Sequence, residues 1–255
     1  MLKNKVFNSF RIISLVPSQT ELLVDLGLED CIVGITKFCI HPTHLKQEKA
    51  IVGGTKNCNF KKIKDLKPTH ILCNKEENTQ EIVANCSKIA TTHISDIYTV
   101  ADVLQLINAY GTFFSTKTTA KQLITKIKSK HNSFIDFIKN KPPLHVAYFI
   151  WKAPWMVAAS NTYINHLLEL NNFKNIYANC NRYPEISIED IGTNKNLDFI
   201  LLSSEPYPFK EKHITEIKKI NPKLKVMLVD GEMFSWPGSR LLKAFDYFKT
   251  LHNHL

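Results

Sequence analysis

Two glutamates follow closely similar stretches of this sequence. Residues 69–78 read THILCNKEEN and residues 198–209 read DFILLSSEPYPF, and each apolar run ends in polar residues that include Glu76 and Glu205. Glu77 comes directly after the first of them. A buried parallel strand reads as a continuous apolar run of roughly four to eight residues, and ligands of open α/β sheets collect at the carboxyl ends of such strands. The repetition predicts two lobes, each with a carboxylate at its strand ends.

A fourth glutamate, Glu232, follows the apolar run KVMLVD. Carboxylates that are partly desolvated together repel one another unless a cation, a metal or a cluster of donors compensates. The pattern therefore favours a ligand that presents positive charge, amide donors or a bound metal. The alternative is that Glu76 or Glu77 forms a salt bridge with Lys56, Lys75 or Arg240 and merely ties loops together. Arg240 could equally hold an acidic group of the ligand, because its planar fork suits a carboxylate or a phosphate.

Aromatic residues follow the same predicted strands. WKAPWMV (151–157) places Trp151 and Trp155 after one apolar run, and four more rings gather at the other strand ends: Tyr207, Phe209, Phe234 and Trp236. Each ring by itself is better explained by packing. As a set they favour a binding site for a flat or partly apolar ligand, such as a macrocycle or a nucleobase.

The segment Cys39-Ile-His41-Pro-Thr-His44 offers soft and borderline metal ligands. Three ligands in six residues with a proline between them rarely close a site, so we expect no metal centre there. His41 is a weak candidate for an axial ligand to a corrinoid or haem iron. No Ser-His-Asp order, phosphate loop or dinucleotide fingerprint is present in the sequence, so we expect a protein that is not an enzyme and requires no cofactor.

Composition narrows the functional classes. The formal charge is +10, and only three of the 33 basic residues are arginine, so lysine dominates a surface that we expect to be solvated. Basic runs do not interleave with aromatic residues, which argues against nucleic-acid binding. The six cysteines form no CxxC pair, which is typical of thiols in a reducing compartment.

The chain contains no apolar stretch near the ~20 residues of a membrane helix. Its start, MLKNKVFNSF, is too polar to supply the apolar core of a signal peptide. We therefore expect a cytoplasmic protein without membrane insertion, unless the chain was trimmed from a periplasmic precursor. We also expect a monomer.

The elements that must position these residues alternate between strand and helix. In the first hundred residues the predicted strands are 11–16, 31–36, 70–73 and 88–95, with helices at 17–27, near 60–66 and at 78–87. In the second half, strand 144–151 and helix 161–170 are followed by the apolar runs ISIEDI, DFILLSS and KVMLVD, and by a last helix that begins near Ser239. Alternation of this kind predicts parallel sheets covered by helices.

One amphipathic helix is predicted to connect the two halves. Residues 112–141 contain neither glycine nor proline, and apolar residues recur along them at helical spacing. At 1.5 Å per residue such a helix is on the order of 40 Å long. The expected fold is α/β, with two Rossmann-like lobes of mainly parallel strands, 1–111 and 142–255, joined by the helix 112–141.

The order of these motifs resembles the helical-backbone (class III) periplasmic substrate-binding proteins, the family of vitamin B12, haem and ferric-siderophore receptors of ABC importers. The resemblance covers nearly the whole chain. Its most informative pieces are RIISLVPSQTELLVDLG, IVGITKFCIHP, NFKKIKDLKPTHIL, YINHLLELNNFKNIY, RYPEISIEDI and VDGEMFSWPGSR. It implies two rigid lobes, a stiff connecting helix and a ligand cleft between the lobes.

Position by position, the resemblance implies a pocket that is half retained. The B12-binding relatives line the cleft with aromatic residues, and Phe38 and Tyr183 keep a ring at such positions. A tryptophan of those relatives is Thr55 here, and an aspartate and an arginine are Glu232 and Trp236. Cobalamin is thus a hypothesis about the class of ligand.

Receptors of this family dock onto their permease through one surface glutamate per lobe. Glu189 of ISIEDI matches the position in the second lobe, whereas the position in the first lobe is Lys61. A lysine that faces an arginine pocket replaces attraction with repulsion. The substitution makes an ABC permease a doubtful partner and favours a family member that acts inside the cell.

These observations predict a binding protein that captures a cobalamin-like ligand, another tetrapyrrole or metal chelate, or a cationic small molecule. One alternative is an ABC importer receptor for vitamin B12 or an iron chelate. Another is a two-lobed metal chelatase, for which His41 opposite Glu205 or Glu232 would supply the histidine and carboxylate.

Overall fold

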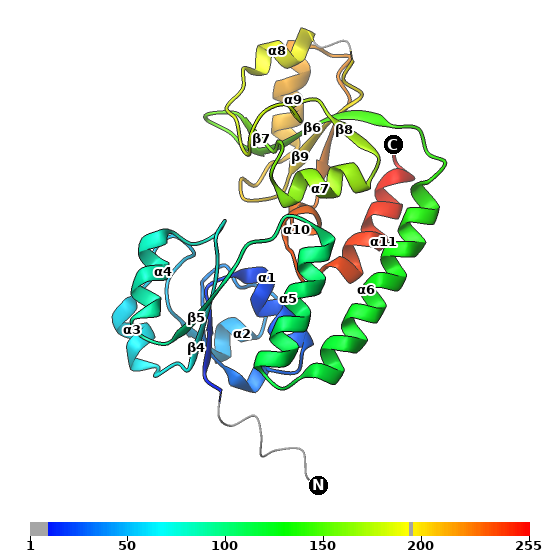
Figure 1. Cartoon of the computed structure of the whole chain (residues 1–255). Helices are drawn as coiled ribbons and strands as arrows, with labels where there is room; N and C mark the ends of the chain where they lie inside the picture. The colour runs from blue at the N-terminus through cyan, green and yellow to red at the C-terminus, as the bar shows by residue number, and fades with distance from the viewer. Residues whose placement is uncertain (1–9, 194–195) are drawn as a thin grey trace. The chain divides into compact units, whose positions relative to one another are not determined.

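The computed structural model describes residues 10–193 and 196–255, which form two compact units with separate sheets (Figure 1). The first unit contains the chain up to Lys128 and the segment Trp236–Leu241. The second contains Ser129–Ser235 and Leu242–Leu255. The predicted two-lobed α/β architecture with mainly parallel sheets is confirmed.

The first unit is built on a five-stranded parallel sheet with the strand order β3-β2-β1-β4-β5. The strands are β1 (Ile12–Ser14), β2 (Ile32–Ile35), β3 (Ala50–Ile51), β4 (His70–Asn74) and β5 (Thr91–Ser95). The central strand β1 is buried throughout, and β4 is buried after its first residue. This burial explains why both strands read as unbroken apolar runs.

Helices cover this sheet on both faces (Figure 1). Ile63, Ile82 and Cys86, from the helices on one face, pack against Ile13 and Cys73 of the sheet. The helical segments are α1 (Pro17–Asp25), the 3-10 turn η2 (Glu29–Cys31), α2 (Leu45–Glu48), α3 (Phe60–Asp65), α4 (Gln80–Ser87) and α5 (Val100–Phe113).

The second unit has a mixed sheet of five strands. Its main path is β10-β9-β6-β7, and β8 also pairs with β6. The antiparallel partner is the short β7, whereas β8, β9 and β10 run parallel to their neighbours. The strands are β6 (Leu144–Trp151), β7 (Met156–Val157), β8 (Phe173–Asn175), β9 (Phe199–Ser203) and β10 (Val226–Val229).

The core of the second unit lies between β6, β9 and the helices that follow them. Phe149, Leu202 and Ile217 are fully buried there. The helices are α7 (Tyr163–Leu170), α8 (Ile188–Thr193), α9 (Glu211–Ile220), α10 (Gly231–Ser235) and α11 (Leu241–His252). Within the described part of the chain, no helix combines the length and the apolar character needed to cross a bilayer.

The connecting helix observed in the structure is shorter than the predicted range 112–141. Helix α5 continues to Phe113, and α6 (Lys117–Ile138) begins only after a break at Ser115, whose φ is +58°. The Thr116 N–H donates to the Gly111 carbonyl at 2.8 Å, which closes the end of α5. A Cβ on Gly111 would lie 2.4 Å from Ala120 Cβ, so the glycine permits the close approach of the two helices.

The boundary of the second lobe also differs from the predicted 142–255. Residues Trp236–Leu241 cluster with the first unit, and the division within the helix falls after Lys128. The backbone of this segment lies close to α1 at Gly238, which has φ +156°. A Cβ on Gly238 would lie 3.3 Å from the Ser18 carbonyl oxygen. The sequence does not reveal that the segment Trp236–Leu241 packs onto the first unit, since the contacts join residues that are far apart in the chain.

Candidate ligand-binding site

The carboxyl-end edge of the first sheet brings together several of the predicted site residues. Thr55 and Lys56 lie in the loop after β3, and Glu76 and Glu77 lie in the loop after β4. The Lys56 ammonium donates to the Glu76 backbone carbonyl oxygen at 2.7 Å, and Thr55 is hydrogen-bonded to Glu77. These four residues therefore form one continuous surface on the first unit.

Two asparagines that the sequence analysis missed shape this surface. Asn74 Oδ1 accepts from the backbone N–H groups of Glu76 at 2.8 Å and Glu77 at 3.2 Å. Asn78 Oδ1 accepts from the Asn74 N–H at 2.9 Å, and its amide donates to the Thr55 carbonyl at 2.9 Å. Both side chains are buried. The signal was the N-x-x-x-N spacing at a strand end, because asparagine readily closes such turns.

The two neighbouring carboxylates have different environments. Glu76 is exposed, whereas Glu77 is half-buried. Burial raises the pKa of Glu77 above its ordinary value, and the adjacent Glu76 raises it further, while Lys56 and the hydrogen bond from Thr55 oppose the shift. The ionised form of such a carboxylate is stabilised when a cation or a metal-bearing group approaches it.

Phe38 lies beside this surface with 49% of its area exposed. Its ring packs near Gly54, where a Cβ would approach Phe38 Cε2 to 3.2 Å, and the Lys37 ammonium lies 5.0 Å from the ring centroid. An exposed aromatic ring beside the half-buried Glu77 carboxylate can stack on a planar ligand. The first unit thus offers both chemical features that the sequence predicted.

Cys39, His41 and His44 have separate contacts in the structure. Cys39 is fully buried, and its sulfur contacts the hydroxyls of Thr20 at 3.1 Å and Thr36 at 3.2 Å. His41 packs edge-on against Trp236, with ring centroids 5.4 Å apart. His44 is hydrogen-bonded instead to the Glu29 carboxylate. All six cysteines are thiols, as predicted.

Arg240 and Trp236 are buried within the first unit and do not line an open surface. The Arg240 Nε donates to Glu21 Oε2 at 2.8 Å, and the guanidinium carbon lies 4.7 Å from the Trp236 ring centroid. Only 4% of the Arg240 side chain is exposed. The proposed role of Arg240 as a ligand clamp is therefore corrected, because its guanidinium forms a buried ion pair with Glu21 of α1. Lys75 forms a salt bridge with Asp96 at 2.7 Å.

In the second unit the aromatic residues divide between surface and core. Trp151 is 40% exposed and packs edge-on against Tyr207, with centroids 5.6 Å apart. Trp155 stacks on the buried Phe209 at 5.9 Å. Phe234 is fully buried against Tyr148 and other core rings. Thus Trp151 and Tyr207 remain candidates for ligand contact, whereas Phe209 and Phe234 are core residues.

Glu205 has a structural partner at the carboxyl end of β9. The Ser235 hydroxyl donates to Glu205 Oε1 at 2.5 Å, which joins β9 to α10. A Cβ on Gly231 would lie 2.6 Å from Glu205 Cγ, so the glutamate is closely packed. Glu232 is half-buried in the first turn of α10, and Tyr183 is half-buried beneath the Arg182 guanidinium, 5.6 Å from its ring centroid.

Comparison with known proteins agrees with this architecture. The family model described as periplasmic binding protein matches residues 12–224. This chain belongs to the periplasmic binding protein family. An uncharacterised ABC transporter substrate-binding lipoprotein, YvrC of Bacillus subtilis, is 26% identical over 71% of this chain and 60% of its own length. The vitamin B12-binding protein of Vibrio cholerae is 24% identical over 73% of this chain and 68% of its own length.

Solved structures of other periplasmic binding proteins have the same fold. The periplasmic vitamin B12 binding protein BtuF of Vibrio cholerae superposes with a TM-score of 0.81 at 20% identity, covering 96% of both chains. A periplasmic haem binding protein of Pseudomonas aeruginosa also gives 0.81, at 18% identity, covering 94% of this chain and 91% of the other. Both likenesses concern the fold.

The two docking positions implied by the periplasmic binding protein resemblance are both at the surface. Glu189 is exposed in the first turn of α8, where the Ser187 hydroxyl donates to its Oε2 at 2.7 Å and lowers the pKa of the carboxyl. Lys61 is exposed on α3. It lines a pocket of about 540 Å³ together with Lys64, Lys67 and Lys88. This face of the first unit therefore attracts acidic groups.

Proposed function

We propose that this chain is a substrate-binding protein without catalytic activity, which captures a small metal-bearing or cationic ligand of the cobalamin or tetrapyrrole-chelate class. The observation that carries the proposal is the Glu76–Glu77 surface at the carboxyl-end edge of the first sheet. Glu77 is half-buried with a raised pKa, and Phe38 beside it is exposed.

Two further observations support this ligand class. Relatives and structural neighbours are described as binding vitamin B12 or haem, which both contain a macrocycle that holds a metal. In the second unit, Trp151 and Tyr207 offer partly exposed rings near the carboxyl ends of β6 and β9. Flat rings of this kind suit a macrocycle better than a small polar solute.

The test is a titration of the purified chain with cyanocobalamin, haemin and a ferric chelate, followed by tryptophan fluorescence. The double variant Glu76→Gln and Glu77→Gln should weaken capture roughly tenfold or more, since a hydrogen bond to a charged group contributes about 1.5–3 kcal/mol. Glu81→Gln, an exposed glutamate in the first turn of α4, is the matched control. Equal affinities of the double variant and the control would refute the site.

The non-enzymatic part of the proposal has its own readout. A binding protein saturates at a fixed stoichiometry and returns the ligand unchanged, whereas a chelatase consumes metal and tetrapyrrole with turnover. Incubation with protoporphyrin and Fe²⁺ or Co²⁺, analysed by absorption spectra, separates these cases. Continuous formation of metalloporphyrin, dependent on His41, would favour the chelatase.

Transport coupling is the second candidate, and the observation in its favour is the exposed Glu189 at one docking position. The opposing observation is the lysine-lined pocket around Lys61 at the other. We propose that the chain acts in the cytoplasm, apart from a permease. Fractionation of the host cell followed by immunodetection tests this location, and recovery of the protein with periplasmic or membrane fractions would contradict it.

A further inference from the structure

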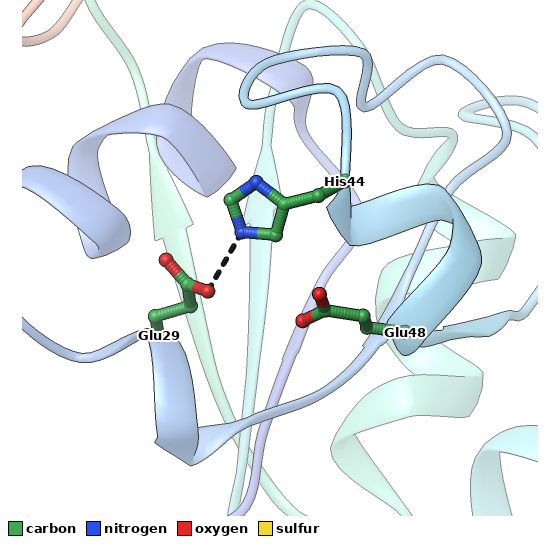
Figure 2. Close-up of side chains that lie close together, drawn as sticks. All are labelled: Glu29, His44 and Glu48. Atoms are coloured by element: carbon green, nitrogen blue, oxygen red, sulfur yellow. Dashed lines mark hydrogen bonds and ion pairs between the residues drawn. The ribbon is translucent and has the colours of Figure 1, made fainter.

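Three side chains with metal-binding atoms meet on the surface of the first unit, away from the Glu76–Glu77 surface. Glu29, His44 and Glu48 each offer one ligand atom, and these atoms all lie within 4.8 Å of one another (Figure 2). His44 Nε2 and Glu29 Oε1 are 2.8 Å apart. Figure 2 shows the Glu48 carboxylate directed toward the same space.

The local structure holds this triad in place. Glu29 begins the turn η2, which leads into β2, while His44 is the N-cap of α2 and Glu48 its last residue. The spacing of four residues places His44 and Glu48 on one side of that helical turn. The Lys49 ammonium donates to the Glu29 backbone carbonyl at 2.9 Å, and the buried Leu45 anchors α2 in the core.

The triad lies at the amino ends of the strands, whereas the candidate ligand-binding surface lies at their carboxyl ends. Glu29 precedes β2 and Glu48 precedes β3, so both are at the amino ends of these strands. Glu76 and Glu77 follow β4 at its carboxyl end. The triad is therefore chemically independent of the function proposed above.

One imidazole and two carboxylates form the type of ligand set that divalent transition metals bind. Metal–ligand bonds of about 2.0–2.2 Å in tetrahedral geometry separate the ligand atoms by roughly 3.4 Å. The observed spread of up to 4.8 Å would have to contract by a small rotation of side chains. The side chains of His44 and Glu29 are 44% and 34% exposed, which leaves them free to make that adjustment and leaves a coordination position open to water.

We propose that Glu29, His44 and Glu48 bind one divalent transition-metal ion of the Zn²⁺ type. The ion replaces the hydrogen bond between His44 and Glu29, and its charge neutralises two carboxylates. It ties the turn before β2 to the helix before β3. Because the metal binds the folded state, it stabilises the first unit by mass action.

Calorimetric titration with Zn²⁺, and absorption spectroscopy with Co²⁺ as a coloured substitute, test the proposal on the full chain at neutral pH. The variants are Glu48→Gln and His44→Gln. Glu48→Gln retains the hydrogen bond between His44 and Glu29 and therefore the local fold. Each variant should lose one equivalent of bound metal, or bind it at least about tenfold more weakly, because even loss of a group that only supports a ligand costs about 10–100-fold.

The matched control is His145→Gln. His145 is also an exposed histidine beside a carboxylate, with Nδ1 3.4 Å from Asp198 Oδ2 and 48% and 44% of the side chains exposed. Among the described residues, no third ligand completes that pair. Zn²⁺ should raise the unfolding temperature of the wild type and of His145→Gln, but not of His44→Gln. Identical isotherms for wild type and Glu48→Gln, or an equal loss in His145→Gln, would overturn the proposal.

Discussion

His252 is a basic group held in an apolar environment at the end of α11. Its ring lies 5.0 Å from the Phe173 centroid, and Phe134 and Phe137 are also within 6.4 Å. Burial lowers the pKa of His252 from 6.5 to about 4, and Lys141 contributes in the same direction. The folded state therefore disfavours the protonated ring.

The consequence is a loss of stability in acid. Since the pKa is lower in the folded state, the unfolded chain binds the proton more readily, and the stabilisation present above pH 6.5 is lost as the pH falls toward about 4. Urea unfolding from pH 8 to pH 4 should show this slope in the wild type and a flatter slope in His252→Gln. The exposed neighbour His254 provides the control variant His254→Gln, and an unchanged slope in His252→Gln would contradict the assignment.

Glu77 and Glu205 show how environment separates residues with similar sequence contexts. Both follow a buried strand, but Glu205 accepts a hydrogen bond from Ser235 and packs against Gly231. Glu77 is instead disfavoured by burial and by Glu76, with only partial compensation from Lys56. The first unit therefore supplies the better candidate for binding a cation, and the second supplies a structural link.

At the scale of elements, the junction between α5 and α6 depends on a backbone conformation that L-residues rarely adopt. Ser115 has φ +58°, and a left-handed residue with a side chain costs roughly 1–2 kcal/mol. Ser115→Gly should remove that cost and raise the free energy of unfolding by about 0.5–1 kcal/mol, after the greater backbone entropy of glycine is subtracted. Urea denaturation measures the difference.

The same change within a helix should have the opposite effect. Ser129 is exposed in the middle of α6, where Ser129→Gly should lower the free energy of unfolding by about 0.5 kcal/mol. If both variants were destabilised equally, Ser115 would not carry the expected strain.

At the scale of the whole molecule, surface charge decides which partners the two units can meet. Glu189 presents an exposed carboxylate in the second unit, while Lys61 and three other lysines surround a pocket on the first. If a permease with arginine pockets is the partner, Lys61→Glu should strengthen the association and Glu189→Lys should weaken it severalfold, because each changes the sign of one contact.

Pull-down from detergent-solubilised host membranes at low and high salt measures this effect, with permease subunits identified by mass spectrometry. Glu211→Lys, at an exposed position in the first turn of α9, controls for a change in net charge alone. The same recovery for Glu189→Lys and Glu211→Lys would exclude docking through Glu189.

Much of the fold could be predicted because it depends on local pattern. The strands β1, β4, β6 and β9 coincide with apolar runs, since strands covered on both faces contain few polar residues. The helix break at Ser115 could not be predicted, because neither glycine nor proline marks it. The tertiary contact between Gly111 and Ala120 favours the turn.

The candidate site was predictable in part. The apolar runs predicted Glu76 and Glu77 at a strand end, because strand ends in parallel sheets converge on one edge. Phe38 was implied by the family resemblance, and Lys56 was considered as a partner of the glutamates. The sequence did not identify Asn74 and Asn78, which hold the loops together, or the partners of Arg240 and Trp236.

The sequence by itself determined the alternation of strands and helices, the division into two sheets and the chemical character of the loops, because these follow from periodicity and residue type. Only the tertiary structure decided that Arg240 returns to Glu21 and that Glu29 meets His44 and Glu48. Arg240 and Glu21 are 219 positions apart in the chain, and no local pattern encodes such a pairing. Their contact arises when the segment Trp236–Leu241 packs onto the first unit, where burial makes an ion pair necessary.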